Sequence, residues 1–539
     1  MPRQSHVFRR YVLLYALFGL VVGLRYGTDA WVFEILSTWV EGKHLLMACA
    51  MVGMLAGDFL GARVSDRYSR VAAVLLAAAG FALSALLGWL ALEAESPDAL
   101  FFGALAFGLG LGVQHSSLDA WFRTATLHTS TRKPTDAEWA WGYTAYTGGF
   151  FAGQALAFPL MYGFNWDLPI AQYQNRNWVP LHLPVYPAPY LLAVVGCLLV
   201  VLARPPSAEF EPAGAGGAGP AAAADEQPRG FIGTIRGGGI AFVMIVLVGA
   251  GVSFLIQHID TFGATDLLAQ ADTVWKKTKG LGVLHLAAAV WVGLFAWTLE
   301  MSERFNTLSP PGRSGVLGLN LGAILFLLAA AMAAASAGSD LLLIAVLIGF
   351  GHALLNTLPQ VVKSAVLDTA GEPDQGTASA ILGVSKRVPN LLLSLALMAR
   401  GGGMPSDQVM YVVLIGVTVL SLLALAIYAV QIRRYRVTAV LICPDYLEGA
   451  EERVRVLVRT EPNITARFSV RHDPADPDGP VRLRVRLYTT QDKRAFVELL
   501  VADLKGLPGV SGIDLDEPGG GANGENTPGP AGVTGSQTS

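Results

Sequence analysis

The chain has 539 residues, of which 53% are hydrophobic and only 15% are charged, and its formal net charge is -3. This composition excludes an ordinary soluble protein and favours a helical membrane protein with many crossings, because long apolar stretches with few charges suit lipid. The three cysteines, Cys49, Cys197 and Cys443, show no metal-ligand or disulfide spacing, and we interpret them as packing residues.

Apolar segments of about 20 residues, the length that crosses a bilayer as a helix, recur along the chain. The first follows basic residues but has no cleavage pattern, so we interpret it as a retained span. The predicted spans lie near 11–31, 44–62, 71–92, 99–122, 142–163, 186–203, 238–259, 281–299, 315–336, 340–362, 378–399 and 409–431. They form an N-terminal six-helix bundle at 1–203 and a C-terminal one at 237–432. A Pro-, Gly- and Ala-rich linker at 204–236 joins them, which we expect to be flexible and cytoplasmic.

A charged stretch, GDFLGARVSDRYSR at 57–70, separates the second and third spans. Transporters of the major facilitator superfamily carry a similar loop, G-x-L-A-D-R-x-G-R, and the chain resembles it at Ala62, Ser65, Asp66, Arg67, Ser69 and Arg70. Ala62 and Ser69 stand where the family usually has glycines, whereas the acid and both basic positions are intact. The resemblance implies an all-α fold of two six-helix bundles around a central cavity, and secondary transport by alternating access.

The same resemblance implies an inner gate at this loop. In the family an acid near the cytoplasmic end of the fourth span accepts the arginine of the loop, so Asp119 would pair with Arg70; proton carrying by Asp119 is the alternative. Asp66 would face the N-terminus of the eleventh span, where the helix dipole favours an anion. The implied gate residues are Asp58, Ala62, Asp66, Arg67, Arg70 and Asp119.

The distribution of basic residues predicts the orientation, because cytoplasmic loops carry an excess of Lys and Arg. With the N-terminus inside, the outside loops hold mainly Lys43, Arg176, Lys276, Lys277, Lys279 and Arg400. The inside loops hold Arg63, Arg67, Arg70, Arg123, Arg132, Lys133, Arg204, Arg229, Arg236, Arg304, Arg313, Arg433, Arg434 and Arg436. We therefore expect a multi-pass protein of the cell membrane with both termini cytoplasmic.

Ionisable residues inside the spans are costly in hydrocarbon, so each is a candidate for solute binding or coupling. Arg25 and Asp29, four residues apart, can face each other as a coupling site or as a self-satisfied pair. His115 suits proton coupling, because histidine changes charge near neutral pH, or it bonds a neighbouring helix. A polar stripe that must face the protein or a cavity recurs every four residues in the tenth span, at His352, Asn356 and Gln360.

Two adjacent cations, Lys386 and Arg387, lie near the bilayer midplane in the eleventh span. One interpretation is an anion-binding site in the central cavity, with Asn390 beside it. The other is internal pairing with Asp58 or Asp29 of the first bundle. These two cations give a slight preference for an anionic solute.

Charged and apolar residues alternate after the last span, which predicts a cytosolic α+β domain at 436–516 and a disordered tail at 517–539. Predicted strands at 437–443, 464–471, 481–488 and 508–515, with helices at 447–459 and 491–505, give the βαββαβ order of a ferredoxin-like sandwich. The order resembles ACT-like ligand-sensing modules and the cytosolic tails of MgtC membrane proteins. One face would be basic, at Arg467, Arg471, Arg482, Arg484 and Arg486.

This basic face would bind an anionic metabolite, anionic lipid or another tail domain, or would be simply solvated. It lacks the exposed aromatic residues of an RNA platform, so we expect no nucleic-acid partner. No phosphate-binding loop, metal triad or nucleophile–base arrangement occurs in the sequence, so we expect no enzyme, cofactor or ATP-driven pump. The predicted function is a secondary carrier of a small solute, coupled to protons and regulated by the tail; the alternative is a membrane regulator or receptor that no longer transports.

Overall fold

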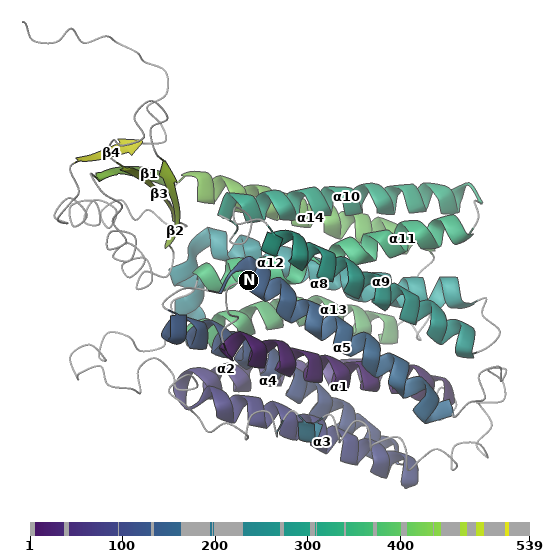
Figure 1. Ribbon diagram of the computed structural model, residues 1–539. Coiled ribbons are helices and arrows are strands. Elements are labelled where there is room, and N and C mark those ends of the chain that lie inside the picture. Colours follow the sequence, from purple (N-terminus) through teal and green to yellow (C-terminus); the bar gives the residue numbers. More distant parts are fainter. Residues whose placement is uncertain are drawn as a thin grey trace, which may run out of the picture.

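The computed structural model describes residues 6–36, 43–94, 96–130, 134–162, 194–196, 198, 230–269, 274–301, 308, 310–338, 341–369, 374–399, 407–434, 436–443, 464–471, 481–489 and 512–516. Within these residues, long helices run side by side and a small β-sheet lies at one end of the helical bundle (Figure 1). We call this end, where α14 leads into β1, the strand end, and the opposite end the far end. Seven of the described helices are long and apolar enough to cross a membrane.

The first lobe contains α1 (His6–Leu36), α2 (Lys43–Arg67), α3 (Arg70–Glu93), α4 (Pro97–Ser130) and α5 (Asp136–Tyr162). Helix α1 packs on α5, and α2 on α4, through glycines four residues apart, a pattern that lets membrane helices approach backbone to backbone. A Cβ on Gly23 would lie 2.0 Å from the carbonyl oxygen of Phe150, and a Cβ on Gly108 would lie 2.0 Å from that of Ala50. Larger residues at these glycines would separate the helices.

The second lobe contains α8 (Gly230–Ala269), α9 (Val274–Met301), α10 (Pro310–Ser336), α11 (Leu341–Leu355), α12 (Leu358–Thr369), α13 (Gln375–Ala399) and α14 (Asp407–Arg434). Each lobe has a large apolar core of its own, but Leu367 of α12 packs into the core of the first lobe, and a small cluster that includes Ala140 of α5 and Ala296 of α9 spans both lobes. Large apolar side chains remain exposed on the outer helix faces, as expected where lipid replaces water. Most of the apolar packing therefore lies within each lobe, and a smaller apolar contact joins the two lobes.

The predicted spans agree with these helices except at the tenth span and at the end of the linker. The sixth span, 186–203, lies almost wholly outside the described residues. The predicted tenth span, 340–362, is not one helix: α11 ends at Leu355 and α12 starts at Leu358 after a two-residue turn. Pro359 explains the break, because proline has no N–H for the carbonyl of residue 355 and its ring clashes with that turn.

The predicted linker at 204–236 is also wrong at its end, because 230–236 is already helical. The ring of Phe231, which is partly buried, packs against Phe59 of α2 with centroids 5.3 Å apart, a contact that the composition of the linker does not indicate. Gly239, with φ of 63° and ψ of -162°, then kinks α8. The rest of the linker lies outside the described residues.

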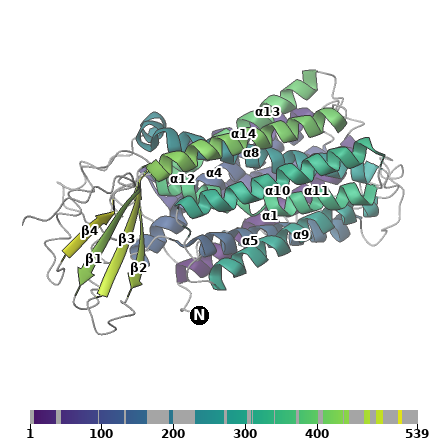
Figure 2. The same ribbon diagram turned by 90° about the horizontal axis from the view of Figure 1, so that it is seen from above.

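The strands β1 (Arg436–Cys443), β2 (Ile464–Arg471), β3 (Val481–Thr489) and β4 (Gly512–Asp516) form one antiparallel sheet in the order β2-β3-β1-β4. Figure 2 shows the sheet extending from the end of α14. The helices predicted at 447–459 and 491–505 lie outside the described residues, so the ferredoxin-like assignment stays a prediction. The register places Arg467 opposite Arg486, Ser469 opposite Arg484, and Arg471 opposite Arg482.

Candidate functional site

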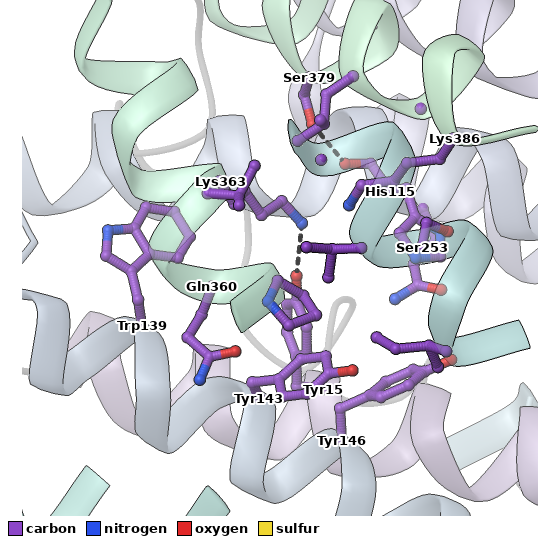
Figure 3. A pocket seen from close by; sticks show the side chains of 18 of the residues that line it. Tyr15, His115, Trp139, Tyr143, Tyr146, Ser253, Gln360, Lys363, Ser379 and Lys386 are labelled. Carbon is purple, nitrogen blue, oxygen red and sulfur yellow. Dashed lines mark hydrogen bonds between the residues drawn. The ribbon is translucent and has the colours of Figure 1, made fainter. Parts of the chain in front are cut away.

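A cavity of about 210 Å³ lies between the two lobes (Figure 3). Side chains from α1, α4 and α5 line it on the first lobe, and side chains from α8, α12 and α13 line it on the second. The two sides differ in chemistry, and we describe them as the aromatic wall and the cationic wall.

The aromatic wall consists of five rings on α1 and α5: Tyr11, Tyr15, Trp139, Tyr143 and Tyr146. The rings of Tyr143 and Tyr146 are stacked with centroids 6.0 Å apart, and Tyr15 meets Tyr146 edge-on at the same distance. Such pairs hold each ring in a defined orientation. The wall therefore offers a rigid, flat and mainly apolar surface with hydroxyl groups at its edges.

The cationic wall carries Lys363 of α12 and Lys386 and Arg387 of α13. Lys363 contacts the fully buried carboxylate of Asp119, and its Nζ donates a hydrogen bond to the Tyr15 hydroxyl at 3.2 Å. Arg387 Nε lies 2.9 Å from Asp58 Oδ2, also fully buried. Both ion pairs join a carboxylate of the first lobe to a cation of the second.

Further polar side chains line the cavity, among them Gln360 and His115. Gln360 is only 4% exposed, and neither of its amide atoms has a hydrogen-bond partner among the described residues. His115 lines the opposite side and directs Nδ1 to the Leu111 carbonyl at 2.7 Å. The backbone carbonyl of His115 accepts a hydrogen bond from Ser379 at 2.8 Å, a third contact between the lobes.

Two glycines of α13 allow carboxylates of α2 to reach its backbone. A Cβ on Gly383 would lie 2.5 Å from an oxygen of Asp58, and a Cβ on Gly376 would lie 2.4 Å from Asp66 Oδ1. Asp66 instead accepts hydrogen bonds from the backbone N–H groups of Gly376 and Thr377, at 3.1 and 2.8 Å. The predicted placement of Asp66 at the N-terminus of the eleventh span is confirmed.

A buried ionic network joins the lobes at the strand end. Arg313 of α10 binds Asp136 of α5 through Nε, 3.0 Å from Oδ1, and also binds Asp368 of α12. Arg123 of α4 reaches the other oxygen of Asp368 at 2.9 Å, and Ser364 donates to Asp136 at 2.9 Å. These contacts close the strand end of the interface between the lobes.

The predicted pairing of Asp119 with Arg70 is wrong. Arg70 donates to the backbone carbonyl of Ala120 and, at 2.7 Å, to the hydroxyl of Thr124. Neighbouring residues on a helix point about 100° apart, so Ala120 faces α3 while Asp119 faces α1 and α12. The acid of α4 therefore binds Lys363 across the lobes.

Lys386 and Arg387 both line the cavity but differ in their partners. Arg387 pairs internally with Asp58, whereas Lys386 lines the cavity without a carboxylate at ion-pair distance in the described part of the chain. Asn390, expected beside them, bonds His258 Nε2 at 3.1 Å and is not among the lining residues.

The expected stripe of the tenth span does not form on one helix, because the turn at residues 356–357 interrupts it. Asn356 bonds His352 Nε2 at 3.1 Å and accepts from Tyr143 at 3.3 Å, whereas Gln360 lines the cavity. Arg25 lies over the ring of Phe107, 5.7 Å from its centroid.

Other predicted residues lie elsewhere or outside the described part. The side chain of Asp29 is outside it, as are those of Arg467, Arg471, Arg482 and Arg484 in the sheet. Ala62 is buried in α2, and Arg67 is exposed at its end.

Sequence reasoning missed Lys363, and it treated Arg123 and Arg313 as loop cations although both are buried. A signal was available: polar residues follow Pro359 at helical spacing, at Gln360, Lys363, Ser364 and Asp368. Such spacing indicates one polar face on a short helix.

Comparisons with known proteins address the family and the fold. The family model described as Major Facilitator Superfamily matches residues 13–394. No curated protein matches the chain by sequence. A D-xylose-proton symporter is similar in structure, with 13% identity over 79% of this chain and 97% of that chain and a TM-score of 0.54.

Two further solved structures are similar. The E. coli fucose:proton symporter has 12% identity over 79% of this chain and 99% of its own, with a TM-score of 0.52. The human organic anion transporter has 18% identity over 78% of this chain and 100% of its own, with a TM-score of 0.51. At these identities the likeness shows the fold. Together with the family match over most of its length, it shows that the chain belongs to the Major Facilitator Superfamily of membrane transporters.

Proposed function

We propose that this protein is a secondary active carrier that moves a small solute by alternating access, driven by a proton gradient. The main supporting observation is that four of the five ion pairs given for the described residues join the two lobes, and that these four lie at the strand end or beside the cavity. Breaking these contacts would weaken the interface between the lobes and so favour opening of the cavity at the strand end. The proton-symporting structural neighbours support the coupling by analogy.

Asp119 is our choice for the coupling carboxylate. The groups that face it are the hydroxyls of Tyr11 and Tyr15 on α1 and the ammonium of Lys363 on α12. Protonation of Asp119 would remove its attraction to Lys363 and weaken one contact between the lobes. A proton would thereby favour opening, which is the linkage that a proton-coupled carrier needs.

The excess of basic residues at the strand end supports a cytoplasmic orientation for that end in the cell membrane. The state described would then be closed to the cytoplasm. The tail sheet contacts the ends of α12 and α14, so a ligand on a ferredoxin-like tail could bias the gate. A receptor without transport activity is the competing function.

Alternating access can be tested without knowing the solute. Cys49, Cys197 and Cys443 are replaced by alanine, and a single cysteine is introduced at Ser253 or at Ser379, both of which line the cavity. Proteoliposomes are treated with an impermeant thiol reagent on one side at a time, at pH 5.5 and pH 8. A carrier reacts from both sides with rates that shift in opposite directions with pH, whereas reaction from one side only, at every pH, would favour the receptor.

A further inference from the structure

The two walls of the cavity demand different things of a ligand. Five aromatic rings from α1 and α5 form one side, and three cations from α12 and α13 form the other. A ligand that satisfies both has a flat apolar body and an anionic group at one edge. A sugar would meet the rings with its apolar face but would bring no charge to the cationic wall.

Three cations line the cavity, but only two carboxylates pair with them, so one positive charge is not balanced within the described residues. Lys363 and Arg387 are matched by Asp119 and Asp58, so these four side chains sum to zero. Lys386 lines the cavity with no carboxylate within ion-pair distance among the described residues. An unmatched charge away from water is costly, and a bound monoanion would remove that cost. A dianion such as a phosphate monoester would overshoot the balance.

Gln360 adds a neutral hydrogen-bonding group to the same wall. Its amide is buried and unpartnered within the described residues, and it lines the cavity less than one helical turn from Lys363 on α12. A buried amide without hydrogen-bond partners destabilises the protein, because its lost contacts with water are not replaced. A ligand with a carboxylate oxygen or a hydroxyl would satisfy it.

The size of the cavity limits the ligand further. A cavity of about 150 Å³ in a protein interior accommodates benzene. The cavity here measures about 210 Å³, which leaves room for one small substituent on a six-membered ring.

On these grounds we propose that the cavity binds a small aromatic monocarboxylate, with its ring against the aromatic wall and its carboxylate at Lys386. The inference rests on the carrier function proposed above and names the class of its solute. The Gln360 side chain donates a hydrogen bond to the same ligand through its NH2 group, or accepts one from it through its carbonyl oxygen.

Calorimetric titration of the purified full-length protein with benzoate and 4-hydroxybenzoate tests this site. Benzamide, which keeps the shape without the charge, D-xylose and phenyl phosphate are the comparison ligands. We expect benzoate to bind at least tenfold more tightly than benzamide and D-xylose, and more tightly than phenyl phosphate. Equal binding of benzamide, or preferential binding of D-xylose, would overturn the proposal.

Variants locate the binding. Lys386→Met should weaken benzoate binding at least tenfold, Lys386→Arg should retain most of it, and Gln360→Leu should weaken it several-fold. Arg63→Gln removes an exposed cation of α2 and should leave binding unchanged. If Lys386→Met melts at the parental temperature and still binds benzoate normally, the proposed binding site is wrong. If Lys386→Met does not fold, unaltered benzoate binding by Gln360→Leu would overturn the proposal.

The two proposals fail in different ways. If cysteines at positions 253 and 379 show alternating access but no aromatic carboxylate binds, the solute class is wrong and the carrier stands. If benzoate binds through Lys386 while access never alternates, the site stands and the protein is a receptor.

Discussion

Thr377 holds Asp66 by two hydrogen bonds, from its backbone N–H at 2.8 Å and from its hydroxyl at 2.9 Å. Asp66 belongs to the first lobe and Thr377 to the first turn of α13 in the second, so this pair fastens the lobes at the strand end. The helix dipole adds to the attraction, because the N-terminus of a helix favours an anion.

Asp66→Asn should loosen this end. The amide cannot accept hydrogen bonds on both of its atoms, and hydrogen bonds to a charged group are worth roughly 1.5–3 kcal/mol. We expect labelling of a cysteine at Ser379 from the strand end to accelerate about tenfold or more. Arg63→Gln, an exposed change on the same helix, is the control, and equal labelling rates in the two variants would contradict the prediction.

Gly383→Ala should be severe although it adds one methyl group. The new Cβ would lie 2.5 Å from the buried carboxylate of Asp58 and would disturb its pair with Arg387. Overpacking of this kind costs about 1–3 kcal/mol. The melting temperature in detergent and thiol labelling of the cavity measure the effect. Gly322→Ala is the matched control, because its Cβ meets nothing within 4 Å, and similar losses in both variants would refute the packing argument.

Arg313→Met should be the most destabilising change at the strand end. It leaves Asp136 without its arginine and removes one of the two arginines of Asp368, while both acids stay buried. Removing one partner of a buried ion pair costs about 3–5 kcal/mol. Adding Asp136→Asn to the variant should restore part of the lost melting temperature; no recovery would argue against an electrostatic origin.

Asp119→Asn should separate proton driving from solute movement. A neutral side chain mimics the protonated acid, so Lys363 loses its ion pair at every pH. We expect solute counterflow, which needs no gradient, to continue, whereas accumulation driven by a proton gradient falls at least tenfold. Accumulation at the parental level would show that another group carries the proton.

Arg467→Glu should stabilise the tail sheet. Arg467 lies directly opposite Arg486, and like charges at facing positions are destabilising, whereas an opposite-charge pair contributes about 0.2–1 kcal/mol. Hydrogen exchange of β2 and β3 in the full-length protein should slow several-fold. Thr465→Glu, opposite the uncharged Tyr488, is the control and should not slow exchange.

Much of the fold follows from local pattern. Apolar length predicts the helices because lipid requires it, and the loop at 57–70 predicts the family and the placement of Asp66. Lys363 was not predicted as a site residue. It follows the helix break at Pro359, where the run of apolar residues that indicates a membrane span ends.

Pairings across the lobes could not be predicted in the same way. Asp119 could meet Arg70 or Lys363, and the choice depends on the rotation of α4 against α3 and α12, which no local pattern encodes. Arg123 and Arg313 were predicted to be loop cations for the same reason. Whether a charged side chain is buried depends on its partners, and here those partners are far away in the sequence.

The turn at residues 356–357 makes α12 a separate piece of twelve residues. Gln360 at the cavity and Asp368 in the ionic network are eight positions apart on it, about 12 Å at the rise of an α-helix. This short helix therefore carries a cavity-lining side chain near its first residue and an ion-paired side chain near its last, with Lys363 between them. If α12 tilts as a rigid helix, a movement of Gln360 at the cavity is accompanied by a movement of Asp368 in the ionic network.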